Sequence, residues 1–143
     1  MQKHVLVSAL ALALVGCSSQ EAAAPAPATT AAATTVATAT ADPAALRKAA
    51  EELDRAATRR DTATAYGFYS QRCKSKIGTE ETYGHMLDVF YDHRTPNYTD
   101  WVVKVNGSSG QVVTVDSDPS APASAMDPRT WTFIDGRWQF DNC

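Results

Sequence analysis

The chain of 143 residues has few cysteines, no excess of positive charge and no long hydrophobic run. Three cysteines are too few for a disulfide-stabilised miniprotein or for a zinc site with four cysteine ligands. Thirteen Lys and Arg against sixteen Asp and Glu give a net charge of −3, which argues against a nucleic-acid-binding protein. The length allows one globular domain with a short appendage.

Motifs of the common enzyme classes are also missing. The sequence contains no H-E-x-x-H, no G-x-S-x-G and no phosphate-binding loop, so we predict no metal site and no cofactor. His85, Asp88 and Asp92 are spaced i, i+3 and i+7, but this spacing directs them away from the apolar side of the same segment. We interpret them as a solvated polar face; a surface metal site and a catalytic group are the alternatives.

The N-terminus has the pattern of an export signal. Lys3 precedes an apolar or small run from Val5 to Val15, which is shorter than the roughly 20 residues that cross a bilayer. The following residues, Leu14-Val15-Gly16-Cys17, resemble the lipobox of bacterial lipoproteins. The resemblance implies that residues 1–16 are removed and that Cys17 carries acyl chains such as palmitate. An ordinary signal peptide with a coincidental cysteine is the alternative.

A tether is predicted between Cys17 and the domain, over residues 17–42. Residues 22–41 contain eleven Ala, six Thr, two Pro and one Val, without any charge. Such a composition buries no apolar face, and its prolines oppose a helix. We expect a disordered spacer that holds the domain off the extracytoplasmic face of the cell membrane. Its threonines are either glycosylated or unmodified.

Three segments predict helices at the start of the domain. Asp42 followed by Pro43 is typical of a helix N-terminus, and the first helix is expected over residues 43–60. The second is expected over 62–72, after the cap Asp61. The third starts after the cap Thr79 and ends before Pro96. Its apolar residues at helical spacing are Tyr83, Met86, Leu87, Phe90 and Tyr91.

After Pro96 the hydrophobic period changes from about 3.6 residues to about 2, which indicates strands. Residues 98–116 predict a hairpin with its turn at 107–110, and residues 117–128 predict a proline-containing loop. Asp135-Gly136 is a strong turn signal between two further strands. Three helices followed by a four-stranded antiparallel meander predict an α+β fold, with the helices on one face of a curved sheet. Aromatic residues of one buried sheet face are Trp131, Phe133, Trp138 and Phe140.

If Cys17 is lipidated, Cys73 and Cys143 are the remaining cysteines. Export places them in an oxidising compartment, so we predict a disulfide between them. Such a bond would fix the end of the last strand to the helices and stabilise the fold by roughly 4 kcal/mol. Two free thiols, or one redox-active cysteine, are the competing interpretations.

Two segments carry a family resemblance: the tyrosine-rich stretch from Asp61 to Cys73, and the ending Asp135-Gly-Arg-Trp-Gln-Phe-Asp-x-Cys143. Over residues 43–143 the sequence resembles small secreted lipoprotein domains of the nuclear transport factor 2-like superfamily, found in high-GC Gram-positive envelopes. The resemblance implies a cone-like sheet around a long helix, with a pocket at its mouth. Candidate pocket-lining residues are Tyr66, Tyr69, Tyr91, Asp100 and Trp131.

The resemblance implies a fold and leaves the function open, because relatives include both enzymes and domains without assigned activity. Our first hypothesis is a membrane-anchored, non-catalytic module that binds a small hydrophobic molecule or an envelope protein. The second is an enzyme similar to ketosteroid isomerases or polyketide cyclases that uses Asp100 or a pocket tyrosine. The third is a structural component of an envelope complex that forms a homodimer through the open sheet face.

Overall fold

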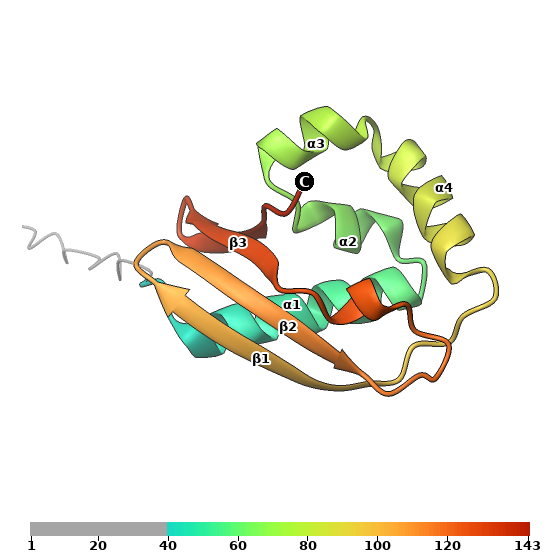
Figure 1. Cartoon of the computed structure of the whole chain (residues 1–143). Helices are drawn as coiled ribbons and strands as arrows, with labels where there is room; N and C mark the ends of the chain where they lie inside the picture. The colour runs from blue at the N-terminus through green and yellow to red at the C-terminus, as the bar shows by residue number, and fades with distance from the viewer. Residues whose placement is uncertain (1–39) are drawn as a thin grey trace, which may run out of the picture. The chain divides into compact units, whose positions relative to one another are not determined.

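The computed structural model describes residues 40–143 of the chain. Four α-helices come first and a four-stranded antiparallel sheet follows, so the fold is α+β (Figure 1). Helix α1 packs along the sheet. The shorter helices α2, α3 and α4 follow it in the chain, and α2 and α4 contact α1. The bounds are α1 (Pro43–Thr58), α2 (Thr62–Gly67), α3 (Gln71–Ile77), α4 (Glu80–Tyr91), β1 (Tyr98–Asn106), β2 (Ser109–Asp116), the 3-10 helix η1 (Ala123–Met126), β3 (Arg129–Ile134) and β4 (Arg137–Phe140).

Several predictions fall on residues that the structure does not describe. They are the signal peptide over residues 1–16, the lipidated Cys17 and most of the tether over residues 17–42. Thr40 to Asp42 form the described end of the tether and lead directly into α1. Within residues 40–143, no helix is both long enough and apolar enough to cross a membrane.

Three helices begin where the sequence predicts, and a fourth, α3, was not predicted. The Asp42 carboxylate accepts hydrogen bonds from the amides of Ala44 and Ala45, which caps α1 as expected. The predicted helix over residues 62–72 is broken, because the backbone at Phe68 and Ser70 pairs with Phe140 of β4. The chain thus leaves the helix to join the sheet edge and starts a new helix, α3, behind a Ser70 cap.

Helix α4 begins after the predicted cap Thr79, but only part of its apolar face is buried. Tyr83, Leu87 and Tyr91 lie in the core. Met86 and Phe90, predicted for the same face, remain 52% and 51% exposed, because the helix contacts α1 and α2 along one edge only.

The sheet is a meander in the order β1-β2-β3-β4, as predicted. Asn106 pairs with Ser109, so the first hairpin turn is two residues shorter than the expected 107–110. The second hairpin turns at Asp135 and Gly136, whose φ angles are 51° and 78°. Positive φ at both positions is what a two-residue turn of this type requires, which explains the Asp-Gly pair.

The core lies between α1 and the sheet. Trp131, Trp138 and Phe140 are buried as predicted, while Phe133 is only partly buried. At Gly110 of β2 the helix comes so close that a Cβ atom would lie 2.5 Å from a methyl carbon of Leu46. A residue without a side chain is therefore needed at this crossing.

A disulfide joins Cys73 of α3 to Cys143, as predicted, and the two Cα atoms lie 5.5 Å apart. Asp141 supports the junction by accepting hydrogen bonds from the Ser70 hydroxyl and from Arg72. The covalent bond and the hydrogen bonds together hold α3 against the chain that follows β4.

Candidate functional site

Asp54 of α1 is a carboxylate inside the core, only 3% exposed. Trp101 Nε1 and Thr114 Oγ1 each donate a hydrogen bond of 2.7 Å to its Oδ2. Arg129 donates to both carboxylate oxygens, at 2.9 and 2.8 Å. Each of the strands β1, β2 and β3 thus contributes one donor side chain to the Asp54 carboxylate, and the four hydrogen bonds compensate for the loss of hydration of the charge.

The terminal nitrogens of Arg129 donate to Asp54 and to the Thr114 hydroxyl. Burial lowers its pKa, but the hydrogen bonds and negative charge of Asp54 outweigh that effect, so the pKa of Arg129 lies above its ordinary value. Its Nε is buried and has no hydrogen-bond partner within residues 40–143. Since Asp54 already accepts four hydrogen bonds, we consider it a structural anchor and not a free base.

A small cavity of about 250 Å³ lies beside this ion pair, between α1 and α4. We call it the tyrosine cavity because Tyr69, Tyr83 and Tyr91 line it together with Leu87 and Arg129. The rings of Tyr69 and Tyr83 meet edge to face, with centroids 4.9 Å apart. The two rings fill part of the cavity, and the remaining lining is partly polar and partly apolar.

The hydroxyl groups around the tyrosine cavity are held in their neutral form. Burial raises the pKa of Tyr69 and Tyr83 above the ordinary value, and it does the same for Tyr98, whose hydroxyl lies 3.1 Å from that of Tyr91. Tyr69, Tyr83 and Tyr98 are therefore neutral hydrogen-bond donors and acceptors at neutral pH.

The five predicted pocket residues do not share one site. Tyr69 and Tyr91 line the tyrosine cavity. Tyr66 does not line this cavity. Its ring packs against that of Tyr83, and its hydroxyl donates a hydrogen bond to the carbonyl of Gly78. Trp131 is fully buried, with its ring against that of Phe140. Trp131 is therefore part of the core.

Asp100, the fifth predicted residue, lies at the surface on the edge strand β1. Its carboxylate is half exposed and 2.7 Å from the Arg47 guanidinium. The hydrogen bond from Arg47 lowers the pKa of Asp100 below its ordinary value, so the group is ionised at neutral pH. Asp100 lines neither the tyrosine cavity nor the larger groove described below.

The polar trio of α4 is in solvent. His85, Asp88 and Asp92 are all exposed, in agreement with a solvated face. Among residues 40–143, the one group of ligand-type side chains within metal-binding distance consists of the two disulfide-bonded cysteines and Asp141. Both sulfur atoms are already bonded to each other, so this group offers a metal no thiolate.

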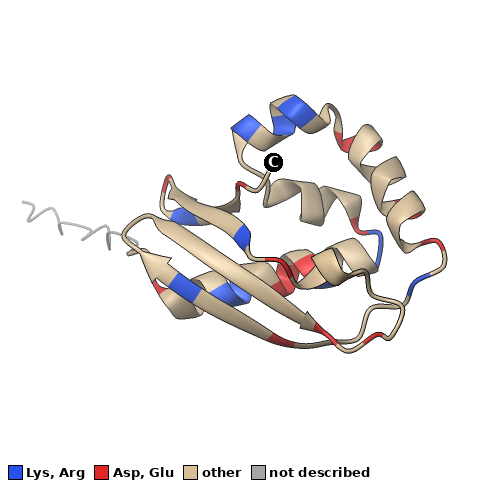
Figure 2. Ribbon diagram, viewed as in Figure 1, with Lys and Arg blue, Asp and Glu red and all other residues tan. Residues whose placement is uncertain are grey.

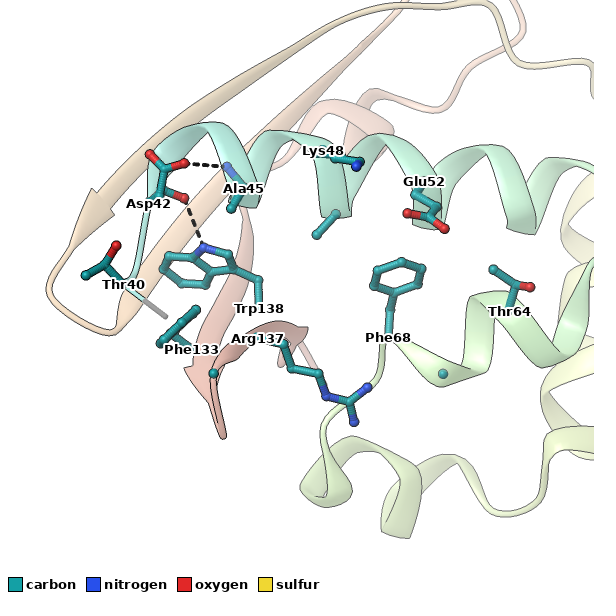
Figure 3. Close-up of a pocket in the computed structure, with 13 residues that line it drawn as sticks. Thr40, Asp42, Ala45, Lys48, Glu52, Thr64, Phe68, Phe133, Arg137 and Trp138 are labelled. Carbon is teal, nitrogen blue, oxygen red and sulfur yellow. Dashed lines mark hydrogen bonds between the residues drawn. The ribbon is translucent and has the colours of Figure 1, made fainter. Parts of the chain in front are cut away.

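A groove of about 690 Å³, larger than the tyrosine cavity, was not predicted from the sequence. We call it the aromatic groove (Figure 3). Trp138 and Phe133 of the second hairpin form one wall, Phe68 at the end of α2 faces them, and α1 closes the groove above. Charged side chains, Lys48 and Arg137 among them, stand at its rim.

The aromatic wall is fixed in place. Phe133 and Trp138 meet edge to face, with ring centroids 5.3 Å apart. Trp138 Nε1 also donates a hydrogen bond of 3.1 Å to the carbonyl of Asp42, directly before α1 (Figure 3). Because both contacts are internal to the fold, the groove exists without a ligand.

The sequence contains signals from which the Asp54–Arg129 ion pair could have been predicted, but none that predicts the aromatic groove. Asp54 lies four residues after Ala50 on the apolar stripe of α1, and Arg129 shares the alternation of Trp131. A charged residue at a buried position on each element indicates a buried pair. The groove combines α1, α2 and a distant hairpin, so no local pattern predicts it.

Comparison of the chain with known proteins finds no match among protein-family models, curated proteins or solved structures. The resemblance to nuclear transport factor 2-like lipoprotein domains therefore remains a prediction.

Proposed function

We propose that the protein is a lipid-anchored lipoprotein of the cell envelope, with a cone-like domain that binds a small, largely apolar molecule without transforming it. The aromatic groove carries this proposal. Its volume of about 690 Å³ falls within the roughly 300–1,000 Å³ of small-molecule sites. The tyrosine cavity, at about 250 Å³, is smaller than that range.

The lining of the groove favours an apolar ligand. Phe68, Phe133 and Trp138 offer ring surfaces, and the α1 side adds small residues such as Ala45 and Ala49. Polar side chains stand at the rim, which is the usual arrangement for a site that orients a mainly apolar molecule. A ligand that displaces water from these rings gains roughly 25 cal/mol per Å² of apolar surface buried.

The positions of Asp54 and Asp100 support binding over catalysis. An isomerase-like mechanism requires a carboxylate that faces the substrate with a free lone pair. Asp100 is ion-paired at the surface, and Asp54 is bound by four donors. The acidic groups at the groove are Asp42, which caps α1, and Glu52 at the rim.

The lipobox-like sequence at Cys17 supports the membrane anchor, and the Cys73–Cys143 disulfide agrees with an oxidising compartment. Thr40 and Asp42, at the end of the predicted tether, line the aromatic groove. The predicted tether therefore keeps the groove close to the membrane, where it can receive a ligand that leaves the bilayer.

The groove is tested by filling it. A Cβ atom at Gly67 would meet nothing within 4 Å, so Gly67→Phe extends a ring into the groove without a clash at the backbone. We expect this variant of the mature chain, residues 17–143 with Cys17→Ser to avoid detergent, to bind the neutral fluorophore N-phenyl-1-naphthylamine at least tenfold more weakly in a fluorescence titration.

Ala63→Phe is the matched control, since Ala63 lies on the same helix, is exposed and does not line the groove. This control should bind the fluorophore like the parent chain. Equal binding by Gly67→Phe and Ala63→Phe, with both variants folded by circular dichroism, would refute the groove as the site.

A further inference from the structure

A second, polar pocket borders the aromatic groove. It has a volume of about 480 Å³ and lies between α3 and the β3–β4 hairpin. We call it the polar pocket; its charged lining residues are Arg72, Lys74, Asp135, Arg137 and Asp141. Arg137 also lines the aromatic groove, so the two spaces meet at this one side chain.

The polar pocket has a positive balance, with three cationic side chains against two carboxylates. Figure 2 shows that Lys and Arg residues are concentrated on α3. Arg72 is occupied, because its Nε lies 3.1 Å from Asp141 and its other nitrogens hold backbone carbonyls. Neither Lys74 nor Arg137 has a carboxylate partner within residues 40–143.

Arg137 is placed to receive an anion from the groove. Its side chain extends from the start of β4 past the aromatic wall toward Phe68 (Figure 3). A guanidinium without a carboxylate partner binds a carboxylate or a phosphate through two parallel hydrogen bonds. Lys74, which stands 4.9 Å above the Tyr66 ring, adds a second positive charge to the same pocket.

We propose that the ligand is a single-chain amphiphile with an anionic head. Its chain lies in the aromatic groove against Phe68 and Trp138, and its head binds Arg137 where the groove meets the polar pocket. This inference rests on the proposed function and adds the ligand class. The head is a carboxylate, as in a free fatty acid, or a phosphate, as in a lysophospholipid, because one guanidinium recognises both.

The experiment measures displacement of N-phenyl-1-naphthylamine from the mature chain by three ligands of equal chain length: dodecanoate, dodecyl phosphate and dodecanol. The anions should displace the probe at about tenfold lower concentration than the alcohol, since the alcohol lacks the charge that Arg137 binds. The better of the two anions identifies the head group.

Arg137→Gln should abolish the preference for the anions over dodecanol. Lys104→Gln, which removes an exposed positive charge from β1 away from both pockets, should preserve it. Equal displacement by dodecanol and the anions, or an unchanged preference in Arg137→Gln, would overturn the amphiphile. Failure of the parent chain to bind the fluorophore would instead refute the groove itself.

Discussion

Two aspartates of this domain show how burial decides the value of an ion pair. Asp54 lies in the core, and its partner Arg129 is largely shielded from water. Asp100 forms an equally short pair with Arg47, but half of each side chain is exposed. Solvent screens the outer pair, whereas removal of Asp54 leaves a positive charge in the core without its counter-ion.

We therefore expect Asp54→Ala to lower the free energy of unfolding by about 3–5 kcal/mol. Asp100→Ala removes a carboxylate with the same type of partner and should have a much smaller effect. Urea denaturation followed by tryptophan fluorescence measures both variants. A similar, small loss in the two proteins would show that Asp54 does not anchor α1 to the sheet.

At the scale of the elements, the parts decided by local chemistry were predictable. The Asp42 and Thr79 caps and the Asp135-Gly136 turn all depend on backbone groups within a few residues, and all three are present. The break between α2 and α3 was not predictable, because it depends on hydrogen bonds to Phe140, some seventy residues later. The exposed side of α4 was missed for the same reason: periodicity shows an apolar face but not its partner.

The close contact between α1 and β2 can be tested by substitution of Gly110. Gly110→Ala would place a methyl group 2.5 Å from Leu46 and 3.1 Å from Trp138, both of which are buried and have little room to move. We expect a loss of about 1–3 kcal/mol in the free energy of unfolding.

Gly67→Ala is the matched comparison, since its new methyl group meets nothing within 4 Å. This change should leave stability equal to that of the parent chain or raise it slightly, because alanine restricts the unfolded chain. A Gly110→Ala protein as stable as Gly67→Ala would mean that the helix and the sheet are not tightly packed at this crossing.

At the scale of the whole molecule, the candidate site combines segments that no single pattern connects. The α+β class and the strand order followed from periodicity, whereas the aromatic groove brings Phe68 to within reach of a hairpin more than sixty residues away. Tyr69 and Tyr91 line the tyrosine cavity, whereas Asp100 is paired with Arg47 at the surface and Trp131 is buried in the core. Strand alternation alone does not tell which face of a sheet is covered.

The predicted lipid anchor of the whole molecule can be tested at Cys17. Cys17→Ala in the full chain removes the thiol that the lipobox resemblance assigns to acylation. We expect the variant to lose its acyl mass and to shift from the membrane fraction to the soluble fraction after high-salt washing. An unchanged distribution would rule out lipidation at Cys17 as the anchor.

The most direct measurement is native mass spectrometry of the full protein, released from its own membrane, beside its Gly67→Phe variant. We expect a non-covalent adduct with the mass of a single-chain anionic amphiphile on the parent protein and its loss from the variant. An adduct of equal abundance on both proteins, or none on the parent protein, would contradict this expectation.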